Sequence, residues 1–247
     1  MAKAFLFVVT SHDQLGTTGN KTGSWLEELA APYWRLRDAG YRIDLASPKG
    51  GAAPLDPTSL EDNWVSDAGR RLLDDPEASA ALANTTRLKD VRSGDYDGLF
   101  MVGGSATVWD FPNNSDLKRI VEEYFALGKV IAGVCHGVIG LTQAVDPNGE
   151  PLVKNRKVTA ISNAEEVMMG LDKVVPVLPE EMLRKLRGVY SCAAPLAEHV
   201  VVDAPLFTGQ NPASADPLGV AIVKYLERSS EAVGSAQREE ALAPGPA

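Results

Sequence analysis

The sequence predicts one α/β domain over residues 1–228, in which helices cover both faces of a mostly parallel sheet. Three observations favour this class. Short apolar runs alternate along the chain with segments of helical periodicity, and the apolar runs are continuous rather than alternating with polar residues. The chain of 247 residues, 45% apolar and 23% charged, is long enough for one substantial domain of ordinary composition.

The first elements are expected in the order strand, helix, strand. Residues 4–10 form an apolar strand, and a helix follows over residues 24–39, where apolar side chains recur at helical spacing and Gly40 provides a stop signal. Residues 41–46 are the second strand. The Pro-, Gly- and Asp-rich stretch 48–62 then predicts a loop.

The middle of the chain contains a polar, partly helical segment at residues 63–93, which we expect to be an excursion from the sheet or a cap over it. A buried strand over residues 99–102 ends at the glycine pair 103–104. A helix is predicted for residues 116–127. Residues 129–132 then form a short β-branched strand, and residues 138–144 are typical of the apolar start of a helix.

Shorter elements follow the turn at residues 146–149. We expect an extended segment at 157–161, a helix at 180–186, paired strands at 200–202 and 206–208, and a last helix at 213–227. From residue 229 onward Ser, Ala, Glu, Gly and Pro predominate, which predicts a disordered tail over residues 229–247.

The stretch Gly-Val-Cys-His-Gly at residues 133–137 carries the clearest chemical signal. A strand, Gly-x-Cys-x-Gly and a helix together form the cysteine version of the nucleophile elbow, in which glycines allow a sharp turn that exposes the side chain. The alternative is a buried structural cysteine at the end of a strand. The two flanking glycines favour a nucleophile at Cys135.

The three histidines differ in what their positions predict. His136 is adjacent to Cys135, and a sharp turn allows both to line one pocket. His12 follows the first strand, at the carboxyl edge where sheets of this class bind ligands, and is a candidate lining residue. His199 is surrounded by surface-type residues and is interpreted as an ordinary exposed histidine.

Two further features suit a site built around a thiol. Glu27 and Glu28 are neighbours in the first helix, so only one can face inward, where desolvation raises the pKa of a carboxyl near a thiol and lets it move protons. Gly104 ends a buried strand. It is either a simple turn residue or a position where the backbone N–H binds an oxyanion.

Composition excludes several classes of function. The net charge of −9, without a cluster of Lys or Arg, disfavours a nucleic-acid or anionic-membrane partner. Two cysteines make no disulfide framework, which indicates a reducing, cytoplasmic setting. No apolar stretch approaches the length of a membrane span, and the apolar run near the N-terminus is too short for a signal peptide.

Several segments together resemble the ThiJ/PfpI superfamily, in particular its heat-shock-chaperone and glyoxalase III-like branch. They occur in the family's order and cover nearly all of residues 3–228. The matching segments are residues 21–32 (Lys-Thr-Gly-Ser-Trp-Leu-Glu-Glu-Leu-Ala-Ala-Pro), 46–51, 103–104 with 109–110, 132–137, 162–166 and 208–214.

The resemblance implies a flavodoxin-like sandwich, a homodimer, and an enzyme that needs no cofactor or metal. Carried over by position, Cys135 is the nucleophile and His136 its neighbour in a triad completed by Glu166. Glu28 hydrogen-bonds the thiol, and Glu27 becomes the solvent-facing carboxyl. The backbone N–H groups of Gly104 and His136 bind the oxyanion.

The sequence departs from this branch at residues 103–106, where Gly-Gly-Ser-Ala replaces the usual Gly-Gly-His-Gly. The pocket loop therefore lacks an imidazole and a flexible residue, while Trp109 suggests an apolar wall. A larger or less polar substrate is the resulting hypothesis. We expect Ser105, Trp109, His12 and Asn163 to contribute to substrate binding.

Three functions remain open on the sequence. The leading one is the glutathione-independent conversion of methylglyoxal, or another 2-oxoaldehyde, to a 2-hydroxy acid through a hemithioacetal on Cys135. The second is hydration of an isonitrile, or hydrolysis of an amide, on a larger apolar substrate at the same elbow. The third is a holdase chaperone or an oxidative-stress sensor that uses oxidation of Cys135.

Overall fold

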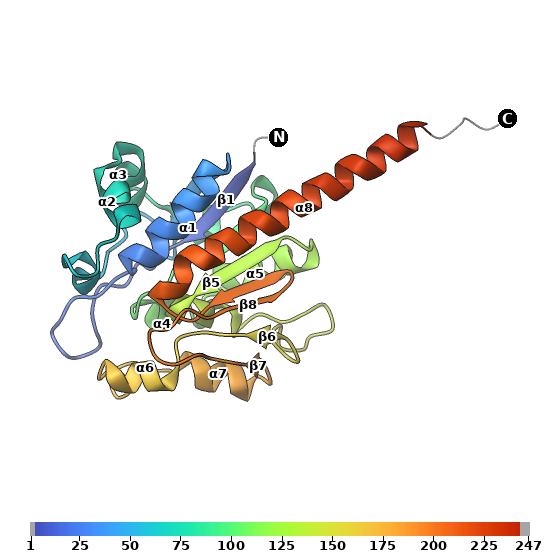
Figure 1. The fold of residues 1–247 in the computed structure, drawn as a ribbon. Coiled ribbons are helices and arrows are strands. Elements are labelled where there is room, and N and C mark those ends of the chain that lie inside the picture. Colours follow the sequence, from blue (N-terminus) through green and yellow to red (C-terminus); the bar gives the residue numbers. More distant parts are fainter. Residues whose placement is uncertain (1–2, 243–247) are drawn as a thin grey trace.

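A seven-stranded sheet forms the centre of the computed structural model, which describes the backbone of residues 3–242 and the side chains of residues 3–229 (Figure 1). The strand order is β3-β2-β1-β4-β5-β9-β8. All neighbours are parallel except the hairpin β8–β9, which confirms the predicted mostly parallel sheet. The strands are β1 (Ala4–Val8), β2 (Arg42–Ser47), β3 (Thr86–Arg87), β4 (Gly98–Met101), β5 (Val130–Val134), β8 (Val200–Asp203) and β9 (Leu206–Gly209).

Helices cover both faces of the sheet, as the flavodoxin-like sandwich requires. Helices α1 (Leu26–Asp38) and α8 (Ala215–Leu242) lie side by side on one face. Helix α5 (Ser115–Ala126) and the 3₁₀ helix η4 (Cys135–Leu141) lie on the other. Successive side chains of β1 enter opposite cores, Phe5 beneath α1 and Leu6 beneath α5. Because both cores are apolar, the strand is apolar throughout.

Residues 63–93 contain two helices and the edge strand of the sheet. They form α2 (Asp67–Asp74) and α3 (Pro76–Ala83), then β3, η2 (Leu88–Asp90) and η3 (Ser93–Asp95). Helix α2 packs against α1, and β3 pairs with β2 as the edge strand. The loop at 48–62 carries the short helix η1 (Pro57–Leu60). This segment therefore lies next to α1 and continues the sheet at β3.

A second small unit lies beside the strands β8 and β9 (Figure 1). It contains the two-stranded sheet of β6 (Lys157–Val158) and β7 (Val189–Tyr190) with helices α6 (Asn163–Met168) and α7 (Pro179–Lys185). Helix α7 was predicted, whereas α6 was not. The capping box between Ser162 and Glu165 is the sequence signal for the start of α6.

The last helix corrects one prediction. Helix α8 continues to Leu242, so residues 229–242 are helical instead of the disordered tail expected from residue 229. Ala, Glu, Gln and Arg in this stretch are strong helix formers, and the first proline after them is Pro244. Residues 243–247 lie outside the described part of the chain. Over the described residues, no helix has both the length and the apolar character needed to span a membrane.

Candidate active site around Cys135

The cysteine lies on a sharp turn between β5 and η4. Cys135 has a φ of 55°, in the left-handed region that is strained for a side chain of this kind, and it is 5% exposed. Gly137 makes the turn possible, because a Cβ there would lie 2.6 Å from the carbonyl oxygens of Met101 and Val102. The predicted elbow is therefore present, with the helical turn starting at the cysteine itself.

Cys135, His136 and Glu166 form a connected chain of side chains. The sulfur of Cys135 lies 3.3 Å from Nδ1 of His136, and Nε2 of His136 lies 2.8 Å from Oε1 of Glu166. Both His136 and Glu166 are buried. A carboxylate accepts a hydrogen bond from Nε2–H, which keeps the proton on Nε2 and leaves the lone pair of Nδ1 facing the thiol. This arrangement suits His136 as the acceptor of the thiol proton.

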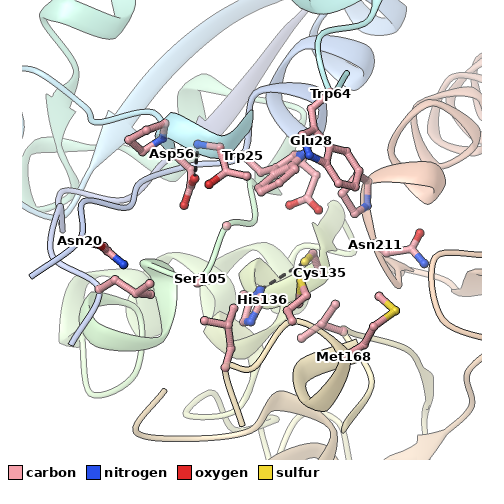
Figure 2. Close-up of a pocket in the computed structure, with 18 of the residues that line it drawn as sticks. Asn20, Trp25, Glu28, Asp56, Trp64, Ser105, Cys135, His136, Met168 and Asn211 are labelled. Carbon is pink, nitrogen blue, oxygen red and sulfur yellow. Dashed lines mark hydrogen bonds between the residues drawn. The ribbon is translucent and has the colours of Figure 1, made fainter. Parts of the chain in front are cut away.

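Glu28 extends from α1 into the space above the sulfur (Figure 2). It is fully buried, and neither carboxyl oxygen has a hydrogen-bond partner of ordinary geometry within the described structure. Burial raises the pKa of Glu28 to about 8, and the nearby thiol of Cys135 offsets part of that increase. A carboxyl with this pKa exchanges protons readily near neutral pH. Glu27 points away and accepts a hydrogen bond from Ser66.

Burial also raises the pKa of the Cys135 thiol, and the neighbouring Glu28 adds to the increase. The backbone N–H of His136 has the opposite effect, because it hydrogen-bonds the sulfur. The thiol and the Glu28 carboxyl are thus coupled, and ionisation of one opposes ionisation of the other. A neighbouring group would therefore have to remove the proton for Cys135 to act as a nucleophile.

The glycine pair after β4 provides backbone close to the sulfur. A Cβ on Gly104 would lie 2.3 Å from the carbonyl oxygen of Gly23, and its φ of 110° strongly favours glycine. The N–H of Gly104 donates to no acceptor within the described residues. It therefore stays available to a developing oxyanion, and the N–H of His136, which hydrogen-bonds the sulfur, lies next to the same position.

These groups open into a cavity of about 600 Å³ between the sheet edge, α1 and α6. Glu28 lies on one side of it and Cys135 and His136 on the other (Figure 2). Gly104 and Ser105 also line it. Most of the remaining lining is apolar and comes from Leu15, Trp25, Pro57, Trp64, Ile161, Met168, Met169, Leu171, Leu196 and Pro212.

Three predicted substrate-binding residues lie outside the cavity. The rings of His12 and Trp109 stack on each other at 5.1 Å, so each packs against the other instead of lining the pocket. Asn163 begins α6, and its N–H donates to Glu180. Glu166 also lies outside the lining, behind His136, which suits the role of acidic partner. Helix α6 thus holds Glu166 against His136, and it does not place Asn163 in the cavity.

A buried polar network beside the triad was not anticipated. Glu165 accepts hydrogen bonds from the side chains of Gln210, Asn211 and Ser162 and from the N–H of Leu196. Burial alone would raise the pKa of Glu165, but these hydrogen bonds outweigh burial and hold the pKa below its ordinary value. The network joins α6 to the segment after β9 and so fixes the helix that carries Glu166.

The described residues contain no evident metal-binding site. No group of three or more His, Cys, Asp and Glu side chains there is arranged to hold a metal ion. The two described cysteines are both free, with Cys135 buried and Cys192 exposed.

Comparison with known sequences identifies relatives over most of the chain. A family model described as DJ-1/PfpI matches residues 22–225. Glyoxalase 3 of Candida albicans is 29% identical over 223 residues, which cover 87% of this chain and 94% of that protein. Glutathione-independent glyoxalase HSP31 of Saccharomyces cerevisiae is 29% identical over 237 residues, with coverages of 91% and 98%.

Solved structures are also similar to this chain over most of its length. The X-ray structure of Rapid Encystment Protein 24 kDa from Francisella tularensis is 37% identical with a TM-score of 0.86, covering 90% of this chain and 98% of its own. The crystal structure of glyoxalase III from Candida albicans is 28% identical with a TM-score of 0.84, covering 90% and 96%. Both structures thus match the fold over almost their whole length.

Proposed function

Because the chain belongs to the DJ-1/PfpI family, we propose that it is an enzyme that converts a 2-oxoaldehyde to a 2-hydroxy acid without glutathione or another cofactor. The family membership confirms the resemblance found in the sequence. The observation that carries the proposal is that one cavity joins a Cys135–His136–Glu166 chain to the buried carboxyl of Glu28. The curated relatives named glutathione-independent glyoxalases support the same reaction.

The first step of the proposed mechanism is addition of the thiol to the aldehyde carbon, C1. His136 takes the proton from Cys135 through Nδ1, while Glu166 holds the other ring nitrogen. A bond forms between sulfur and C1, and the carbonyl electron pair moves to the oxygen. The N–H groups of Gly104 and His136 face that charge, and the proton on His136 completes the hemithioacetal.

The second step moves a proton from C1 to C2. Ionised Glu28 removes the C1 proton, and the electron pair moves onto the C2 oxygen to give an enediolate. The C1 hydroxyl proton passes to the C2 oxygen and Glu28 returns its proton to C2, which leaves a thioester on Cys135. Water then breaks the carbon–sulfur bond and releases the 2-hydroxy acid. C1 is oxidised from aldehyde to acid while C2 is reduced from ketone to alcohol, so water is the only co-reactant. The pKa of about 8 makes Glu28 a stronger base than an ordinary carboxylate.

A homodimer and a cytoplasmic location complete the proposal. Both stay predictions of the sequence and of the family resemblance. Light scattering from the purified chain at several concentrations tests the dimer, and a mass equal to one chain throughout would contradict it.

A substrate panel followed by proton NMR tests the proposed reaction against the alternatives. The purified chain is mixed in separate samples with methylglyoxal, an alkyl isonitrile and a primary amide, all without glutathione. We expect lactate from methylglyoxal and no product from the other two. Formation of an N-formamide or a carboxylic acid, without lactate, would overturn the glyoxalase assignment. Suppression of aggregation of a client protein, with no turnover at all, would favour the chaperone.

A further inference from the structure

The cavity above Cys135 is much larger than methylglyoxal. From its size and walls we propose that the preferred substrates are 2-oxoaldehydes that carry an aromatic ring, an inference that rests on the proposed glyoxalase function. The cavity holds about 600 Å³. Methylglyoxal takes up roughly the volume of three waters, each about 30 Å³ in the liquid. Most of the cavity would therefore stay filled with water around so small a substrate.

One wall of the cavity is aromatic. The rings of Trp25 and Trp64 meet edge to face, with centroids 5.3 Å apart and planes at 83°, and both lie near Glu28 in Figure 2. The indole N–H of Trp25 is buried and finds no partner in the described structure. A rigid pair of rings offers a third ring a ready stacking surface at low entropic cost.

The wall opposite the tryptophan pair is formed by flexible methionine side chains. Met168 and Met169 of α6 and its following turn line the cavity, although they are 52% and 41% exposed. Met168 lies across the cavity from the tryptophan pair in Figure 2. Methionine side chains are flexible and polarisable, and their sulfur contacts aromatic edges favourably. Together the two walls suit a flat apolar group that enters beside the reacting carbons.

Two charged residues that line the cavity, Asp56 and Lys21, already have partners. Both carboxyl oxygens of Asp56 accept hydrogen bonds, from Thr22 and from the N–H of Thr58. Lys21 is paired with Asp13. These groups would lose existing bonds if they bound a polar or charged substituent. At the loop beside the sulfur, Ser105 fills less space than a histidine would. The mostly apolar lining, rather than these two charged residues, therefore determines which substituent fits best.

Competing turnover of phenylglyoxal and methylglyoxal tests the proposal. We expect kcat/KM for phenylglyoxal to exceed that for methylglyoxal by about tenfold or more, since burying a ring adds this much selectivity in an apolar pocket. Trp64→Ala should lower that ratio by about fivefold. Leu60→Ala changes a residue of similar exposure that lies outside the cavity, and it should leave the ratio unchanged.

A binding measurement separates failure of this inference from failure of the proposed function. Tryptophan fluorescence of the Cys135→Ala variant is titrated with mandelate and with lactate, the two hydroxy-acid products. Mandelate should bind about tenfold more tightly than lactate, and Trp64→Ala should remove the difference. Equal binding, or equal kcat/KM for the two aldehydes, would overturn the aromatic preference while leaving the glyoxalase intact. Tighter binding of mandelate without turnover of either aldehyde would support the aromatic pocket and contradict the proposed reaction.

Discussion

A Cβ atom at Gly103 would lie 2.1 Å from Oε2 of Glu28. The same atom would lie 2.6 Å from the carbonyl oxygen of Val134 and 2.9 Å from Cβ of Cys135. The first glycine of the pair thus leaves room for a buried carboxyl next to the nucleophile. Because two of the neighbours are backbone or a fixed Cβ, the site could not accommodate a side chain by a simple rotation.

Gly103→Ala should therefore reduce activity strongly. The added methyl group displaces Glu28, Cys135 or both, and a displacement of about 1 Å costs on the order of 100-fold in kcat. Steady-state turnover of methylglyoxal by the folded variant measures the loss. Gly94→Ala is the matched control, because a Cβ at Gly94 meets no atom within 4 Å. Normal activity in Gly103→Ala would show that the position of Glu28 does not matter.

The activity should rise with pH through about 8. Burial raises the pKa of Glu28 to about 8, and the proposed base is its ionised form, so the active fraction grows as the pH passes that value. Glu28→Gln should lose on the order of 10²- to 10⁴-fold in kcat and lack this rise. A profile of kcat/KM between pH 6 and about 10 checks both expectations. A profile that falls through pH 8 would instead identify Glu28 as an acid.

The same carboxyl should make the fold less stable as the pH rises. The pKa of Glu28 is about 8 in the fold against 4.5 ordinarily, so the folded state holds its proton longer than the unfolded chain. The resulting stability is complete below pH 4.5 and is lost as the pH rises through about 8.

Glu28→Gln should therefore increase the free energy of unfolding near pH 8, by on the order of 5 kcal/mol, and flatten its dependence on pH. Urea unfolding at a low and a high pH measures the difference. Glu61→Gln removes an exposed carboxyl and serves as control. An unchanged pH dependence in Glu28→Gln would contradict the raised pKa.

Glu166→Gln should slow the reaction while leaving binding nearly unchanged. Oε1 of Glu166 lies 2.8 Å from Nε2 of His136, and an amide there no longer fixes the proton on that nitrogen. We expect a loss on the order of 10²- to 10⁴-fold in kcat, as for the wrong tautomer in other triads. The split between kcat and KM, with the melting temperature as a check on folding, tests this. An effect on KM alone would assign Glu166 to substrate binding.

The inner strands β1, β4, β5 and β9 were predictable because they are buried on both faces, whereas the exposed edge strand β3 was not predicted. Continuous apolar runs such as 99–102 are unambiguous, and the elbow at 133–137 combines a strand with two glycines. Helix α6 was missed, since only six residues form it and the capping box at Ser162 is its main signal. The length of α8 was missed because a composition typical of disorder also contains strong helix formers.

The candidate site was predictable for reactive residues that directly follow a strand of the central sheet. Cys135, His136 and Gly104 follow strands that end at one edge of the sheet, so their meeting is dictated by topology. The tryptophan pair of the cavity was missed, because Trp64 reaches it from an irregular segment whose path local sequence does not determine. Trp109 was expected there, but its stacking on His12 gives the ring another place to pack.

Lactate formation from methylglyoxal without glutathione, compared between the wild type and two cysteine variants, tests the central claim most directly. The account predicts lactate from the wild type and from Cys192→Ala, whose exposed thiol lies outside the cavity, and none above background from Cys135→Ala. Equal lactate formation by Cys135→Ala would contradict the account, because the reaction would then proceed without the nucleophile at the elbow.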